Sequence, residues 1–180
     1  MTYPVNVRGV LESLAATRAV TGEIVIPDVE LGEQLYAFLE PVRFEVTLTN
    51  TGEGILASGT AATTVRTPCV RCLREFDLPV AGEVEGFYIF PGHDDQMPEE
   101  QEFAHIAEDS SVDIEPAVAQ CIVVDLPFAP LHDVDCKGIC AVCGGDRNLD
   151  ECTCSSEVPD PPFAGLKDLL ASADEAPGMS

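Results

Sequence analysis

The chain has 180 residues, enough for one large domain or for a domain with appendages. Its 32 Asp and Glu outnumber its nine Lys and Arg, which gives a formal net charge of −23. This charge disfavours a stand-alone nucleic-acid-binding protein, because affinity for phosphate backbones comes largely from Lys and Arg. It favours encounters with basic proteins instead, although an acidic surface that serves only solubility is an alternative interpretation.

The acidic residues are concentrated in the middle of the chain. Between Arg74 and Lys137 there is no Lys or Arg, and this interval carries sixteen Asp and Glu. Residues 1–8 lack the basic and apolar segments of a secretion signal, and no run approaches the roughly 20 apolar residues of a membrane span. We therefore expect a cytoplasmic protein whose cysteines stay reduced.

The N-terminal half is expected to be rich in β-strands. Residues 8–18 form a short helix or turn, and residues 20–26 alternate as a strand that ends at Pro27. Residues 44–49 and 55–66 are β-branched, alternating segments joined by a Gly-containing turn, which predicts a hairpin. Two further extended segments, 75–80 and 83–90, follow a Cys-x2-Cys pair. This pattern predicts an antiparallel meander folded into a sandwich or an open barrel.

The C-terminal half is expected to contain one clear helix. Residues 91–110 are acidic and predict a mobile loop, in which His93 and His105 are solvated. Asp113 lies near the N-cap of a helix with Pro116 in its first turn, and the apolar run 117–124 forms its body. Residues 162–172 are long enough for two helical turns that dock through apolar side chains, and the last residues are expected to be disordered.

These elements predict an α+β fold in which an antiparallel β meander carries a C-terminal helix and a small cysteine-rich metal knot. The expected parts are a β-rich body (1–90), an acidic loop (91–110), a helix that packs on the body (111–127), a cysteine-rich metal-binding segment (128–156) and a tail with a short docking helix (157–180).

Five cysteines lie at C-x3-C-x2-C-x8-C-x-C spacing near the C-terminus. Thiols at such spacing can converge on one tetrahedral metal, and the glycines after Cys143 permit the sharp turn of a metal knuckle. The expected ligands are Cys140, Cys143, Cys152 and Cys154, with Cys136 as a fifth candidate that replaces one of the last two. Zinc is the expected metal because no redox role is implied, although four thiolates also accept iron.

A second thiol pair, Cys69 and Cys72, lies far upstream. It is either a pair of reduced thiols at a hairpin tip or a second metal-binding pair, and whether it shares a metal with the C-terminal cysteines stays open. Cys121 is interpreted as a small apolar core residue.

Several linked segments resemble the YceD-like large ribosomal RNA subunit accumulation family. They are Cys69-Val-Arg-Cys72-Leu-Arg-Glu-Phe, Asp113-Ile at a helix start, Leu126-Pro-Phe-Ala-Pro-Leu-His132, the run from Asp135 through Cys143-Gly with Asn148-Leu, the pair Cys152-Thr-Cys154, and Pro162-Phe-Ala-Gly-Leu-Lys-Asp-Leu-Leu. The resemblance spans roughly residues 20–172.

This resemblance implies a bacterial cytoplasmic protein that supports accumulation of the large-subunit (23S) rRNA, and it implies no known catalytic activity. In the family the C-terminal cysteine cluster occurs in some members only, whereas the C-x-R-C pair is broader. His132 departs from the cysteine that many cluster-bearing relatives have at this position. It is either an extra ligand or a solvated, hydrogen-bonded residue.

The sequence favours a non-enzymatic factor, since it contains no phosphate-binding loop, H-E-x-x-H or G-x-S-x-G motif. The expected partner is a basic large-subunit ribosomal protein or a pre-ribosomal particle. One alternative is a direct rRNA-binding protein that uses Arg66, Arg71 and Arg74, the only local basic cluster. A second alternative is a zinc-dependent or thiol-redox regulatory protein.

Overall fold

The computed structural model describes residues 2–90, 92, 102–149 and 152–154. The chain divides into two compact units, unit 1 (Met1–Cys136) and unit 2 (Lys137–Ser180). This boundary falls inside the predicted cysteine-rich segment 128–156, whereas the predicted tail helix at 162–172 lies outside the described residues. No helix in the described part of the chain is long and apolar enough to cross a membrane.

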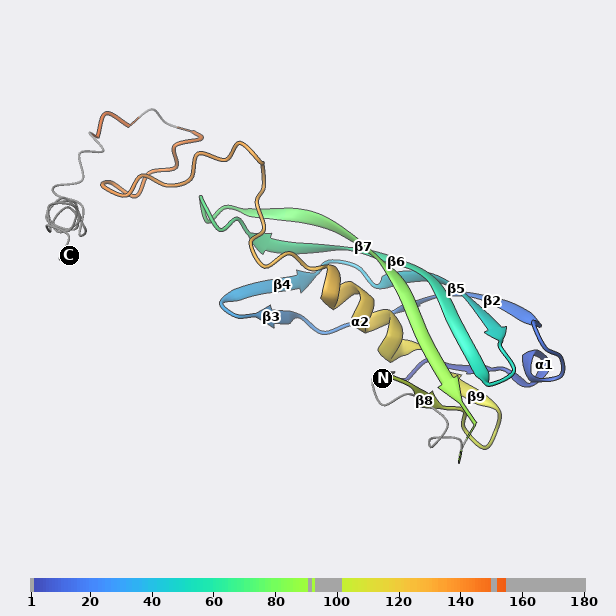
Figure 1. Cartoon of the computed structure of the whole chain (residues 1–180). Helices are drawn as coiled ribbons and strands as arrows, with labels where there is room; N and C mark the ends of the chain where they lie inside the picture. Colours follow the sequence, from blue (N-terminus) through green and yellow to red (C-terminus); the bar gives the residue numbers. More distant parts are fainter. Residues whose placement is uncertain (1, 91, 93–101, 150–151, 155–180) are drawn as a thin grey trace, which may run out of the picture. The chain divides into compact units, whose positions relative to one another are not determined.

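Unit 1 is built mainly from antiparallel strands (Figure 1). Its elements in chain order are β1 (Pro4–Asn6), α1 (Arg8–Leu11), β2 (Thr17–Ile24), β3 (Val29–Leu31), β4 (Gln34–Phe38), β5 (Val42–Asn50), β6 (Gly54–Pro68), β7 (Glu75–Ile89), β8 (Ala104–His105), β9 (Ser111–Asp113) and α2 (Glu115–Asp125). The predicted antiparallel α+β fold with its later helix is thus confirmed.

The main sheet has the strand order β2-β5-β6-β4-β3, with β7 paired to β6 on the side away from β5. The hairpin of β6 and β7 is its longest pairing, in register from Gly54 opposite Ile89 to Pro68 opposite Glu75. A separate two-stranded sheet pairs β1 with β9, and β8 adds in parallel to the end of β7. The predicted hairpin at 44–66 is present as β5 and β6.

Some element boundaries differ from the prediction. The predicted helix or turn at 8–18 contains only the single turn of α1, and β2 begins at Thr17 rather than at residue 20. The two predicted segments 75–80 and 83–90 form the one continuous strand β7. Of the predicted loop 91–110, residues 91 and 93–101, including His93, lie outside the described residues. His105 lies in β8 and is exposed, with its ring 5.8 Å from that of Phe103.

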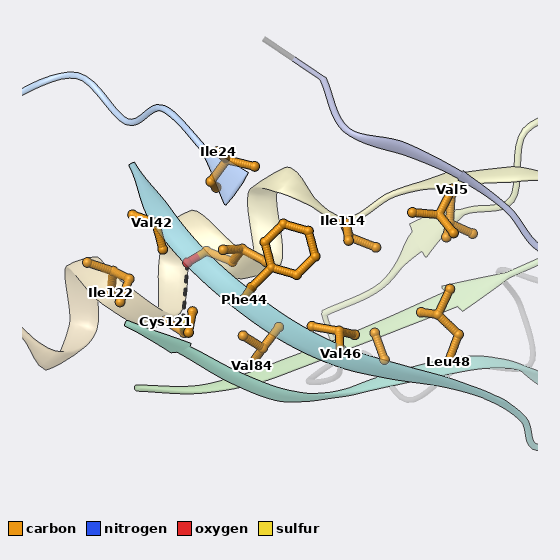
Figure 2. Close-up of a cluster of buried hydrophobic side chains, with 14 of the residues drawn as sticks. Val5, Ile24, Val42, Phe44, Val46, Leu48, Val84, Ile114, Cys121 and Ile122 are labelled. Atoms are coloured by element: carbon orange, nitrogen blue, oxygen red, sulfur yellow. Dashed lines mark hydrogen bonds between the residues drawn. The ribbon is translucent and has the colours of Figure 1, made fainter. Parts of the chain in front are cut away.

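The hydrophobic core lies between the sheet and α2. Strand β5 alternates between buried side chains and exposed or half-buried ones, so that Phe44, Val46 and Leu48 all face inward. Figure 2 shows these side chains in one buried cluster together with Val84 from β7 and Ile122 from α2. Each large apolar side chain buried in this way contributes roughly 1.5–3 kcal/mol to folding.

Helix α2 starts where the sequence predicts it. The carboxylate of Asp113 accepts a hydrogen bond from the backbone N–H of Glu115, at 3.1 Å, and Pro116 follows in the first turn. Cys121 is buried in the core, with its thiol donating to the carbonyl of Val118 at 3.2 Å. Its predicted role as a small apolar core residue agrees with this position.

Two glycines allow α2 to lie directly on β7. A Cβ on Gly82 would meet the backbone carbonyl oxygen of Cys121 at 2.9 Å and the carboxylate of Asp125 closer still, and a Cβ on Gly86 would come within 3.2 Å of Ala117. Because this contact holds the end of α2 against the sheet, it also directs the chain after Leu126 toward the tip of the β6–β7 hairpin. The phenol of Tyr36 in β4 donates to the carbonyl of Pro127 and holds that segment at its start.

Candidate metal centres

All eight cysteines carry reduced thiols, and seven of them fall into two clusters. The hairpin-tip cluster consists of Cys69, Cys72, His132 and Cys136, all in unit 1. The C-terminal cluster consists of Cys140, Cys143, Cys152 and Cys154, all in unit 2. In each cluster one ligand atom from every residue lies within 4.8 Å of the others.

The hairpin-tip cluster begins directly after strand β6, which ends at Pro68. The buried side chains of Val65, Thr67 and Cys69 follow the period of two that holds along this strand, so Cys69 points to the same side as the core residues. Beyond it, the chain reverses through Cys72 into β7. Thr67 and the carbonyl of Pro68 both accept hydrogen bonds from the amide of Gln34, each at 2.7 Å, which fixes the base of the hairpin tip.

The reversal from Cys69 to Arg74 has the backbone of a metal knuckle. The N–H of Leu73 donates to the carbonyl of Cys69, and the N–H of Cys69 donates to the carbonyl of Arg74, both at 2.9 Å. Leu73 adopts a left-handed conformation with φ of 61°. Burial raises the pKa of the Cys69 thiol, but hydrogen bonds from His132 and the knuckle backbone outweigh it and lower the value to about 5.

Unit 2 repeats the same backbone arrangement around Cys140 and Cys143. The N–H of Gly144 donates to the carbonyl of Cys140, and the N–H of Cys140 donates to the carbonyl of Gly145, both at 2.8 Å. Gly144 has a φ of 73°, the counterpart of Leu73. The two Cys-x2-Cys segments are therefore equivalent knuckles, and the glycine predicted to matter in the second is replaced by a strained leucine in the first.

The thiol pKa values show how the C-terminal cluster distributes charge. Hydrogen bonds from the backbone of Cys143 and Val142 lower the pKa of Cys140 to about 6. The hydrogen bond with Cys140 raises the pKa of Cys152, and that with Cys143, together with burial, raises the pKa of Cys154 to about 11. A thiolate in this cluster thus makes ionisation of the neighbouring thiols unfavourable, because like charges repel. A divalent cation at the centre of the cluster would remove this repulsion.

The residues present fit a tetrahedral metal in both places. Four thiolates, or three thiolates and an imidazole, are the donor sets of closed zinc sites, whereas calcium and magnesium take oxygen ligands. The structure brings together all four cysteines expected in the C-terminal cluster. It places Cys136, the expected fifth candidate there, with Cys69 and Cys72 instead.

His132 joins a cluster in which the sequence analysis did not place it. Its Nδ1 lies 3.4 Å from the sulfur of Cys72, although the two residues are 60 positions apart. One signal could have identified it. The first knuckle supplies only two ligands, and His132-x3-Cys136 has a spacing typical of a second ligand pair.

The three arginines near the first knuckle have local partners. Arg66 forms a bidentate ion pair with Asp77, at 2.7 and 3.1 Å. Arg71 donates to the carbonyls of Val134 and Cys136, at 3.3 and 3.0 Å. A guanidinium nitrogen of Arg74 lies 3.3 Å from Nε2 of His132. These contacts connect the three arginine side chains to neighbouring residues of the hairpin tip.

Replacing Leu73 by glycine is expected to stabilise unit 1. A non-glycine residue in the left-handed conformation costs roughly 1–2 kcal/mol, and glycine avoids this cost. Glycine also increases the chain entropy of the unfolded state, which offsets about 0.4–1 kcal/mol of that gain. Leu73→Gly should therefore raise the free energy of unfolding by up to about 1 kcal/mol, as measured by urea unfolding. Val70→Gly, in the same knuckle, is the control and should lower it. An equal loss in both variants would contradict the argument.

Comparison with known proteins identifies the family. The model of the family described as large ribosomal RNA subunit accumulation protein YceD matches residues 57–170, a range that includes every residue of both clusters. An uncharacterized protein of Mycobacterium leprae is 27% identical over 131 residues, which covers 73% of this chain and 60% of the relative. Uncharacterized proteins of Mycobacterium bovis and Mycobacterium tuberculosis are each 32% identical over 123 residues, covering 66% of this chain and 56% of the relative.

The chain thus spans less than two thirds of the length of these relatives. No solved structure matches it. The family match covers well over half of the chain and contains both knuckles and helix α2. On this basis the chain belongs to the YceD family of large ribosomal RNA subunit accumulation proteins.

Proposed function

We propose that this chain supports accumulation of large-subunit rRNA as a non-enzymatic binding factor in the cytoplasm, and that its partner is a basic ribosomal protein or a basic part of a pre-ribosomal particle. The family supplies the link to large-subunit rRNA. The choice of partner rests on one observation: carboxylates are distributed over the exposed side of β7 and the neighbouring face of α2.

A groove of about 680 Å³ runs beside β7. Its lining includes the carboxylates of Glu83, Glu85, Glu102 and Asp125, and no Lys or Arg of the described part of the chain lines it. Apolar side chains lie among them, namely Leu56, Phe87 and the 74% exposed Val124. A surface that combines several carboxylates with apolar contact area suits a basic segment with occasional apolar residues.

The backbone of β7 adds to this surface. Among the described residues, β7 pairs with β6 along its whole length, but on its other side only Tyr88 and Ile89 pair with a strand, β8. The N–H and C=O groups of a sheet edge can accept an extended peptide as an added strand. A basic, extended segment of a ribosomal protein would thus find both backbone partners and carboxylates along β7.

The alternative of direct rRNA binding through Arg66, Arg71 and Arg74 has less support. The side chain of Arg66 is engaged with Asp77, and that of Arg71 with backbone carbonyls. Phosphate binding would have to compete with these contacts and with the net charge of −23. The second alternative, thiol-redox regulation, would require the clustered thiols to pair as disulfides rather than bind a metal.

The test is binding of purified basic large-subunit proteins to the full chain at increasing salt. Affinity should fall as ionic strength rises, because exposed charges more than a Debye length apart are screened. Glu83→Gln with Glu85→Gln should weaken binding by about two- to thirtyfold at low salt, as expected for two exposed ion pairs at about 0.2–1 kcal/mol each. The measurement is calorimetry or fluorescence anisotropy.

The control is Glu30→Gln with Glu33→Gln, which removes the same charge from exposed positions of β3 and the turn after it. This variant should bind almost as well as the wild type. Equal weakening by both pairs, or binding that does not respond to salt, would contradict the proposed surface. An electrophoretic shift of large-subunit rRNA by the wild type, abolished by Arg71→Ala with Arg74→Ala, would favour direct RNA binding.

A structural zinc ion in the C-terminal cluster is the second part of the proposal. The donor set of Cys140, Cys143, Cys152 and Cys154 fits a closed zinc site, in which four protein ligands leave no position for a reacting water. Such an ion would supply folding energy to unit 2 without catalysis. Its role is therefore to shape the chain, and the acidic surface of unit 1 remains the candidate for partner binding.

A further inference from the structure

We propose that Cys69, Cys72, His132 and Cys136 bind a second zinc-type divalent cation, separate from the C-terminal cluster, and that this cation cross-links the tip of the β6–β7 hairpin to the segment after α2. The inference concerns unit 1 alone. It does not depend on the proposed partner or on a metal in unit 2.

The distances within the cluster match those of a tetrahedral site. Zinc with sulfur ligands at about 2.3 Å and an imidazole nitrogen at about 2.0–2.1 Å places two sulfurs about 3.8 Å apart and a sulfur and a nitrogen about 3.6 Å apart. The sulfurs of Cys69 and Cys136 are 3.8 Å apart, and the sulfur of Cys72 is 3.4 Å from Nδ1 of His132. A disulfide requires about 2.05 Å, so the sulfur separation corresponds to shared coordination and not to a bond.

The surroundings hold the four ligands in place. The backbone N–H of Val70 donates to the carbonyl of Pro130 at 3.0 Å, which joins the knuckle to the later segment just before His132. Arg71 donates from the knuckle to the carbonyls of Val134 and Cys136 on the other side of the histidine. These contacts hold the two segments together without using the thiols or the imidazole.

Burial argues for a closed site. Cys69, Cys72 and Cys136 are 0%, 6% and 5% exposed, and they form a small cluster of their own with the partly buried Phe76 and Leu131. The ring of Phe76 packs edge-on against that of His132, with centroids 6.4 Å apart. An apolar shell around three sulfurs and one nitrogen excludes water from the metal and suits a structural ion.

The donor set selects the class of cation. Three thiolates and one imidazole favour zinc and disfavour calcium or magnesium, which require oxygen ligands. Coordination through Nδ1 leaves the proton of the neutral imidazole on Nε2. Arg74, whose guanidinium now lies 3.3 Å from Nε2, then turns to another acceptor, which its exposed position allows.

The cross-link would act across a long stretch of chain. Cys69 and Cys136 are 67 positions apart, and the chain between them includes β7, the acidic region and α2. An ion at the hairpin tip would close this stretch of chain into a loop. It would join the tip of the β6–β7 hairpin to the segment that follows α2. The hairpin-tip cluster therefore belongs to the architecture of unit 1, although its knuckle has the same backbone arrangement as the knuckle of unit 2.

The experiment uses the full chain with the C-terminal cluster disabled by Cys140→Ser and Cys143→Ser, expressed without a metal-affinity tag. We expect this variant to retain about one zinc per chain by elemental analysis, with X-ray absorption showing sulfur ligands at about 2.3 Å and nitrogen at about 2.0–2.1 Å. A folded variant, by circular dichroism, that holds no metal would overturn the proposal. So would a Cys69–Cys136 disulfide found by mass spectrometry after thiol alkylation, or an iron-specific absorption spectrum.

Changes at His132 test the ligand set within that same background. His132→Ala should weaken zinc affinity by more than the roughly 10–100-fold that loss of an outer-shell partner costs. His132→Cys should restore binding and convert the absorption spectrum to sulfur ligands only. If His132→Ala binds zinc as tightly as its parent, or if the nitrogen signal persists in His132→Cys, the assignment of His132 is wrong.

Discussion

Replacing Cys140 and Cys143 by serine is expected to unfold the described part of unit 2 (137–149 and 152–154) while the sheet of unit 1 stays folded. In this part of the chain, Cys140 is the only hydrophobic residue that is buried, and Ile139, Val142 and Leu149 are exposed. With so little apolar burial, folding is expected to depend on the proposed zinc ion, since the apparent binding free energy in small zinc modules is about 10–16 kcal/mol. Amide chemical shifts of unit 2 should collapse into the unfolded range, as measured by NMR.

Val142→Ser is the matched control. This residue lies inside the same knuckle and is 69% exposed, and its contact with the sulfur of Cys140 comes from the backbone N–H, which serine keeps. Its spectrum should remain dispersed. If the double cysteine variant keeps a dispersed unit 2, folding of this unit does not need the metal and the structural role is refuted.

The same site should lose metal as the pH falls. Metal ligation requires thiolates, and the raised pKa values of Cys152 and Cys154 mean that both are protonated near neutrality when no metal is bound. Binding therefore releases at least the two protons of these thiols, and affinity should fall by at least about 100-fold per pH unit. Below the pKa of Cys140, about 6, the proton of that thiol must also be released, which makes the fall steeper. Titration with a zinc indicator from pH 8 to pH 5 measures this slope.

Ile122→Ala is expected to lower the stability of unit 1 by about 2–5 kcal/mol, the usual cost of truncating a buried isoleucine. Ile122 is 0% exposed and lies in the core between α2 and the sheet, as Figure 2 shows. A cavity there removes contacts that neighbouring side chains cannot replace without moving the helix. Urea unfolding of unit 1 provides the measurement, with the unchanged slope as evidence that the transition is the same.

Val124→Ala, two positions along the same helix, is the control. Val124 is 74% exposed, so its truncation should change the free energy of unfolding by no more than about 0.5 kcal/mol. The comparison holds the helix and the new residue constant and varies only burial. Comparable losses in the two variants would show that helix formation, and not core packing, determines the effect.

Local sequence signals located several elements correctly. The alternating segments at 44–49 and 55–66 predicted the β5–β6 hairpin because period-two burial is a property of neighbouring residues. Asp113, just before the N-cap residue Ile114, predicted the start of α2 because its carboxylate accepts from a backbone N–H only two positions away. The four C-terminal cysteines predicted one cluster because a short segment brings them together by its own turns.

Signals that depended on strand pairing were harder to interpret. Residues 75–80 and 83–90 were expected as two extended segments, yet they form the one continuous strand β7, which contains Pro79 and Gly82 in its interior. Within the residues that the structure describes, β7 pairs with a strand on one side only around these positions, so a proline without an N–H is tolerated there. Gly82 is required because α2 approaches β7 closely at this position, and no local sequence pattern reveals that approach.

The sequence by itself determined the chemistry of this protein: a strongly acidic chain, two Cys-x2-Cys knuckles and an α+β pattern with one helix after the strands. Only the tertiary structure decided that His132 and Cys136 belong with Cys69 and Cys72. Cys136 is four positions from Cys140, yet it lies with Cys69, from which it is separated by 67 positions. The physical reason is that α2 packs on β7 and thereby brings the following segment to the hairpin tip. This packing uses the buried Val118, Cys121 and Ile122, and the local spacing of residues does not reveal it.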